Sequence, residues 1–229
     1  MLNRAETIFN KLEEINSEVL KDKTVRDDLL KYRGNLAANI YSRYRKDKNA
    51  VSIEKEERTD GEKRETELEK ARKLHKENLE ERRKIRAEIT EDIDNRIAQS
   101  CLGIATSYYM LGEYPEAIKY NKRGIKEAAE NADALKYRAY TNIIGAYAKM
   151  PAYTEDDIAD MVKCLKKALR LANSGKIRNY YADDIKKNLE TIKSNMTEEQ
   201  KKSRRKDLEI IDAGMAFLAG ESYNSGNKQ

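Results

Sequence analysis

Apolar residues recur at spacings of three and four along most of the chain, which is the period of an amphipathic helix. In residues 3–22 they fall on one helix face: Ile8, Leu12, Ile15, Val19 and Leu20. The same period predicts a terminal helix that starts after Thr197, a suitable N-cap, and runs to about 219. Between these two helices it predicts several others, for a total of about nine or ten; they include helices over 27–45, 95–111, 132–149 and 177–194.

Residues 107–120, which read SYYMLGEYPEAIKY, interrupt this pattern with a glycine and a proline. Gly112 can end the first helix in a left-handed conformation at little steric cost. Pro115 then falls in the first turn of the next helix, where its fixed φ and missing N–H are tolerated. Glu116 is favoured at the same N-terminus by the helix dipole. The stretch therefore predicts a corner between two helices.

Three segments repeat this helix, turn, helix pattern. They align on Ala71, Ala117 and Met161, about 45 residues apart. Three further sets of positions correspond: His75, Asn121 and Leu165; Asn78, Gly124 and Ala168; Leu79, Ile125 and Leu169. Repeated helix pairs that bury their apolar faces against one another form a solenoid.

The middle segment resembles the tetratricopeptide repeat family. The resemblance rests on a large residue, a small one, a tyrosine, a turn glycine, a tyrosine and an alanine at the family's offsets: Cys101, Ile104, Ala105, Tyr108, Gly112, Tyr114, Ala117, Tyr120 and Ile125. It covers 98–128 and extends over 134–172 through Ile144, Gly145, Ala168 and Leu169. The chain departs from the family in lacking tryptophan, since Cys101 and Thr141 stand in that position. Its longer unit is similar to the variant in kinesin light chains and bacterial regulators.

The resemblance implies an all-α fold, a right-handed superhelix of antiparallel helix pairs. We expect a single domain over 1–219, closed by the terminal helix as a cap. Residues 46–64 hold an Asp-Gly pair and little apolar content. They are expected to form a mobile charged insertion, followed by a helix that begins near Glu65. The tail 220–229 is expected to be disordered.

Composition favours an interaction protein over an enzyme. The chain is 38% charged, with 46 basic and 41 acidic residues, which indicates a mixed surface. It holds a single histidine, His75, and its glycines do not gather into a phosphate loop. Cys101 and Cys164 lie in helical patterns without metal-ligand spacing, so we interpret them as reduced core residues. We expect no catalysis, no metal, no cofactor and no small-molecule substrate.

Location follows from the apolar runs. No run approaches the roughly 18 residues that a membrane span needs. The first residues, MLNRAETIFNKLEEIN, carry acids early and have no apolar signal core. The sequence therefore predicts a cytoplasmic protein without membrane contact.

The resemblance also implies a binding site. In such repeats the first helix of each pair lines a concave face that takes a peptide or helix of another protein. Amides there could bond a peptide backbone, and cations could attract its carboxylates. It places these residues on that face: Asn35, Asn39, Arg43, Gln99, Leu102, Thr106, Tyr109, Met110, Asn142, Ala146 and Lys149. An ordinary solvated helix face explains the same residues equally well.

Two alternatives stay open. Basic clusters at 42–46, 82–86 and 201–206 could contact the phosphates of RNA or DNA. The residues that would do so include Arg43, Tyr44 and Arg45, where an aromatic alternates with cations, and Arg204 and Arg205. The repeats could instead serve self-association, through the last helix or an uncapped first helix.

Overall fold

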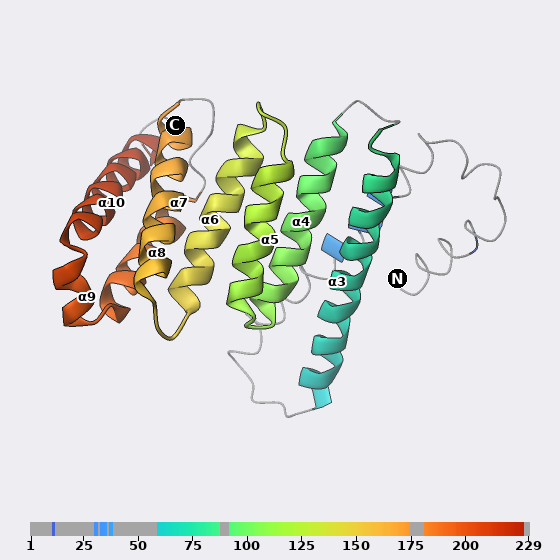
Figure 1. The fold of residues 1–229 in the computed structure, drawn as a ribbon, viewed down its shortest axis with the longest axis horizontal. Helices are drawn as coiled ribbons and strands as arrows, with labels where there is room; N and C mark the ends of the chain where they lie inside the picture. The colour runs from blue at the N-terminus through green and yellow to red at the C-terminus, as the bar shows by residue number, and fades with distance from the viewer. Residues whose placement is uncertain are drawn as a thin grey trace. The chain divides into compact units, whose positions relative to one another are not determined.

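The computed structural model describes residues 59–87, 92–174 and 181–226, with short pieces at 11, 30–31, 33–35 and 37–38. All regular secondary structure in these residues is helical, which confirms the all-α class (Figure 1). Residue contacts divide the chain into two compact units, Met1–Glu113 and Tyr114–Gln229. The single domain over 1–219 stays a prediction. None of the helices in the described ranges is long and apolar enough to cross a membrane.

In the first unit, α3 (Thr59–Ile85) packs along α4 (Ile93–Met110). Part of its core is a small cluster of Ala37, Leu68 and Ala71. Three partly buried side chains pack against this cluster: Leu74, Met110 and Leu111. Ala37 belongs to the helical pieces at 33–35 and 37–38, which agree with the helix predicted over 27–45.

Helix α3 begins earlier than its sequence suggests. It starts at Thr59 rather than near Glu65 and includes the Asp-Gly pair at 60–61 in its first turn. Threonine and aspartate are favourable at a helix start, where their side chains and charge suit the unpaired N–H groups. The expected helix start near Glu65 is therefore wrong. The part of the expected insertion over 46–58 lies outside the described residues, as does the helix predicted over 3–22 except Lys11.

Helix α4 ends at the predicted corner. Gly112 has a φ of 81°, the left-handed region. Its N–H donates to the Tyr109 carbonyl at 3.2 Å, and the Glu113 N–H donates to the Tyr108 carbonyl at 2.9 Å. This pair of bonds is a Schellman motif. Helix α5 (Tyr114–Glu127) follows with Pro115 in its first turn, so both local predictions are confirmed.

The second unit consists of packed helical hairpins (Figure 1). Helix α6 (Asp133–Lys149) packs against α5, α7 (Glu155–Asn173) and α8 (Ala182–Asn195). Helix α10 (Arg205–Gly226) packs against both α7 and α8. The hairpins α6/α7 and α8/α10 therefore lie side by side. Their shared core is apolar and includes Ile143, Ile144, Leu165, Ile185 and Leu189.

The aligned repeat positions are equivalent in burial. Three sets of positions are buried in every segment: Ala71, Ala117 and Met161; His75, Asn121 and Leu165; Asn78, Gly124 and Ala168. In the fourth set Leu79 is buried, whereas Ile125 and Leu169 are partly exposed. The alignment therefore selects positions with the same packing role in both units.

The predicted terminal helix is two helices. Thr197 caps α9 (Glu198–Ser203) in a capping box with Gln200, as expected of an N-cap. The backbone then leaves the helical conformation at Arg204, with φ −106° and ψ 31°. Helix α10 starts at Arg205 and continues to Gly226, so the expected disordered tail is helical up to that residue.

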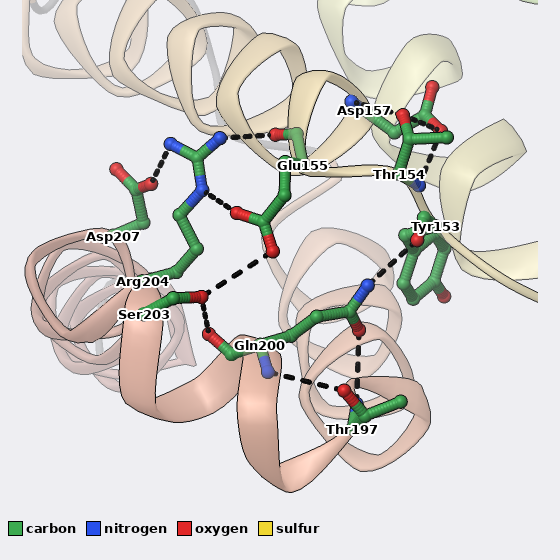
Figure 2. A network of polar contacts seen from close by, with 9 residues as sticks. All are labelled: Tyr153, Thr154, Glu155, Asp157, Thr197, Gln200, Ser203, Arg204 and Asp207. Atoms are coloured by element: carbon green, nitrogen blue, oxygen red, sulfur yellow. Dashed lines mark hydrogen bonds and ion pairs between the residues drawn. The ribbon is translucent and has the colours of Figure 1, made fainter.

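The break at Arg204 coincides with a polar network at the start of α7 (Figure 2). The guanidinium Nε donates to the Glu155 carboxylate and Nη2 to the Glu155 carbonyl, both at 2.5 Å. Nearby, the Gln200 amide donates to the Tyr153 carbonyl at 2.7 Å. These contacts stabilise the non-helical backbone at Arg204. Because Glu155 is remote in sequence, the local pattern around Arg204 does not predict the break.

Candidate functional site

The predicted site residues of α4 divide between surface and core. Gln99 is exposed, and Thr106 and Tyr109 are half-buried, so all three reach the surface of the first unit. Met110 instead packs against the cluster of Ala37, Leu68 and Ala71. Leu102 is only 1% exposed. Its placement on a binding face is therefore wrong, because the core covers it.

On α6, Asn142 is half-buried and Lys149 is exposed. Arg138 is exposed one turn before Asn142 and was missed by the sequence interpretation. The spacing puts the three on one helix face. We call Arg138, Asn142 and Lys149 the α6 strip. Ala146 is 0% exposed and lies outside it, which corrects its predicted place on the binding face.

A buried asparagine orients the centre of the strip. Asn121 of α5 is buried and donates to the Ala117 carbonyl at 2.9 Å. Its side-chain oxygen then accepts a hydrogen bond from the Asn142 amide at 3.4 Å. Asn142 thus contacts Asn121 through its nitrogen, which leaves its side-chain oxygen as the group that can accept a further hydrogen bond.

Helix α8 adds another amide to this surface. A Cβ placed on Gly145 would lie 3.4 Å from the Asn188 amide nitrogen. Gly145 is one turn after Asn142 on α6, so Asn188 comes close to the strip because Gly145 has no side chain. Sequence reasoning missed Asn188. The available signal was the glycine, which inside a helix often has a packing reason.

The strip has unbalanced charge at both ends. Among the described residues, neither Arg138 nor Lys149 forms a hydrogen bond or an ion pair. Their Cα atoms are about 16 Å apart along the helix axis, from the rise of 1.5 Å per residue. One acid is near, because Asp184 is exposed one turn before Asn188 on α8. The surface offers amides in the middle and cations at its ends.

The buried titratable groups do not suit acid–base work. Burial, with the nearby Arg82 charge, lowers the pKa of His75 to about 4, so the ring is neutral at neutral pH. Burial raises the pKa of the Cys164 thiol to about 12. Both cysteines are buried free thiols, which confirms that they are unpaired core residues. Within the described ranges, no cluster of three histidine, cysteine or acidic side chains could hold a metal.

The basic clusters predicted for nucleic acid are mostly paired with acids where the structure describes them. In 82–86, Arg82 is buried, and the remaining cations contact acids: Arg83 with Glu80, Lys84 with Glu81 and Arg86 with Asp94. In 201–206, Arg204 contacts Glu155 and Asp207, and Arg205 contacts Glu209 at 3.5 Å. Cluster 42–46, with Arg43, Tyr44 and Arg45, lies outside the described residues, as does Asn39. Nucleic-acid binding through these clusters stays a prediction.

Comparison with known proteins does not assign a family. No protein-family model matches this chain, and a search of curated proteins gave no match. The resemblance to tetratricopeptide repeats stays a prediction based on the residues quoted above. What the chain does must be inferred from its own contacts, burial and charge.

Proposed function

We propose that the protein is a non-catalytic adaptor that binds an extended segment of another protein on the α6 strip, beside Asn188. One observation carries the proposal. The Asn142 amide is held by a buried asparagine between two exposed cations that have no acidic partner in the described residues. An ordinary solvated helix face needs neither the buried support nor the unbalanced charge.

An extended peptide has N–H and C=O groups that need partners when they leave water. Asparagine can supply both a donor and an acceptor, so Asn142 and Asn188 can bond such a backbone. Arg138 and Lys149 would attract carboxylates of the bound segment. Because the strip lies on packed helices, little ordering of the protein would oppose binding.

The wider reading of the chain belongs to the same proposal. We propose that the helix pairs form tetratricopeptide-like units of a right-handed superhelix. On α4 the exposed or half-buried Gln99, Thr106 and Tyr109 would provide the corresponding contacts of the first unit. Cytoplasmic location stays a prediction as well.

Selection of peptides from a random display library on the immobilised full chain tests the proposal. We expect acidic peptides to be selected, because both strip cations are unpaired. The variant Asn142→Ala with Lys149→Glu should lower the affinity for a selected peptide at least tenfold, or by about 1.4 kcal/mol. Fluorescence anisotropy of the labelled peptide measures this loss. The matched control is Asn173→Ala with Lys202→Glu, where both side chains are exposed and lie outside the strip.

Two results would contradict the proposal. One is a library that yields no peptide. The other is a selected peptide whose affinity is the same for the strip variant and the control variant. Circular dichroism of the variant checks its fold, since Asn142 bonds Asn121. The single change Lys149→Glu, at an exposed side chain, gives a second reading that leaves this bond intact.

A further inference from the structure

The C-terminal half of α7 carries four cations on one exposed face. Their spacing of i, i+3, i+4 and i+7 places them together on the helix surface. We call this set the α7 basic face: Lys163, Lys166, Lys167 and Arg170. All four side chains are exposed. None of them has a hydrogen bond or ion pair with any residue that the structure describes.

Helix stability alone does not account for this face. The first turn of α7 is acidic and Arg170 lies in its last turn, an arrangement that suits the helix dipole. The dipole effect fades beyond the terminal turn, so it leaves Lys163 and Lys166 unexplained. Like charges three and four residues apart destabilise a helix. The arrangement therefore indicates an anionic partner.

A neighbouring helix extends the basic face. Lys122 of α5 forms an ion pair with Asp160 of α7 at 2.8 Å, which brings α5 to this side of α7. Lys126 lies one turn further along α5 and is exposed. It likewise has no acidic partner in the described part of the chain. Cations from two helices thus contribute to one surface.

We propose that the α7 basic face binds the phosphodiester backbone of a nucleic acid. The four cations span about 10 Å of helix axis, a length over which a duplex presents several phosphates. Three of the four are lysines, whose ammonium groups contact phosphates as point charges without a fixed bidentate geometry. The four side chains offer no aromatic ring or amide to read a base, so binding should be independent of sequence.

The residues exposed beside the basic face favour nucleic acid over a lipid surface. An interfacial helix inserts large apolar side chains such as Trp, Phe or Leu into the membrane. On the exposed face of α7 the residues preceding the cations are Asp156 and Ala159. The face is also separate from the α6 strip, since the two lie on different helices.

Fluorescence anisotropy of the full chain with labelled duplex DNA and duplex RNA, over a range of salt, tests this inference. Four phosphate contacts predict that log K falls with log salt with a slope of about −3.6. Lys163→Glu with Lys167→Glu should reduce affinity at least tenfold and reduce the slope by about 1.8. The matched control is Lys73→Glu with Lys187→Glu, both exposed and outside the basic clusters, which changes net charge equally and should alter affinity less than threefold.

Three results would overturn the proposal. The first is absence of binding to either duplex at about 50 mM salt, where phosphate contacts are strong. The second is an equal loss in both variants, which would show a response to net charge alone. The third is binding to vesicles of phosphatidylserine and phosphatidylcholine without binding to nucleic acid. A difference between the DNA and RNA arms identifies which backbone the face prefers, and circular dichroism confirms that the variants fold.

Discussion

Helices α3 and α7 occupy aligned positions in the repeat but fill them with opposite chemistry. At two buried positions α3 has His75 and Asn78, where α7 has Leu165 and Ala168. One turn further α3 buries Arg82, which is 4% exposed. A similar packing position is thus served by directed polar contacts in the first unit and by apolar burial in the second.

The polar side of α3 is specific about its partners. The Asn78 amide donates to the Leu30 carbonyl at 3.0 Å. The Arg82 guanidinium donates to the Ser100 hydroxyl at 2.8 Å and to the Arg96 carbonyl at 3.0 Å, and burial lowers its pKa to about 10. Such bonds add little net stability, but losing one partner leaves a buried group unsatisfied. They therefore fix how α3 lies against α4 and against the helical piece at Leu30 more than they stabilise this packing.

The apolar side of α7 has no such direction. Met161, Leu165 and Ala168 are almost fully buried. Gly214 of α10 lies close to Leu165 and Leu169, so the two helices approach through a glycine. Apolar burial is roughly proportional to area and carries no angular requirement. The apolar contacts of α7 should accordingly contribute more stability than the polar contacts of α3.

The largest expected effect comes from removing a buried side chain from the apolar side of α7. Leu165→Ala should lower the free energy of unfolding of the second unit by about 2–5 kcal/mol, since it leaves a cavity in a packed core. Urea unfolding followed by circular dichroism measures this loss. Lys166→Ala, next in sequence but exposed, should change stability by less than about 0.5 kcal/mol. A loss below about 1 kcal/mol for Leu165→Ala would contradict the proposed difference between the apolar contacts of α7 and the polar contacts of α3.

The next effect is a pH dependence of stability that is expected in the first unit and not in the second. His75 has a pKa of about 4 when folded, against an ordinary value of 6.5. Between these values the unfolded chain binds more protons than the folded chain, so stability rises with pH. The contribution is complete above pH 6.5 and is lost as the pH falls towards 4. Between pH 7 and 5 we expect the first unit to lose about 2 kcal/mol through this residue.

His75→Leu is the control for that pH dependence, because it installs the residue found at the aligned position of α7. The variant retains every carboxylate, so the difference between the two stability curves isolates the histidine. His75 is the single histidine of the chain, hence the second unit should show no such difference. Parallel curves for the wild type and the variant between pH 7 and 5 would contradict the expected burial of a neutral ring.

Local patterns predicted those features whose causes are local. The apolar period placed most helices, and the corner at Gly112 and Pro115 followed from backbone chemistry within a few residues. The helix start at Thr59 was missed, because an Asp-Gly pair was interpreted as a breaker although it lies within the first turn. The cap at Thr197 was found for the same local reason as the corner.

Features that depend on remote partners were not predictable. The helix break at Arg204 depends on Glu155, and the place of Asn188 depends on the register of α8 against α6. Periodicity predicted which residues share a helix face, but not how much of that face neighbouring helices bury. Leu102 and Ala146 were misplaced for this reason, since both are buried. Arg138 shared a face with Asn142, yet only the absence of an acidic partner among the described residues made it a candidate.

The last expected effect, of a size similar to that of His75 or smaller, compares one glycine from each unit. A Cβ on Gly103 of α4 would lie 2.4 Å from the His75 ring, whose burial leaves it little room to move. A Cβ on Gly214 would lie 3.2 Å from the end of the flexible Leu169 side chain. Gly103→Ala should therefore cost about 1–3 kcal/mol through overpacking. For Gly214→Ala the better helix propensity of alanine, about 1 kcal/mol, should offset most of the strain.

A double-variant cycle in urea unfolding makes the comparison sharp. In Gly103→Ala with His75→Ala, the space left by the ring accepts the new methyl group. The combined loss should then be smaller than the sum of the two single losses by at least about 0.5 kcal/mol, the size of coupling expected for residues in contact. Additive losses would mean that the ring does not lie over Gly103. The first unit would then lack the close approach of His75 to Gly103, which is tighter than the contact of Leu169 with Gly214 in the second unit.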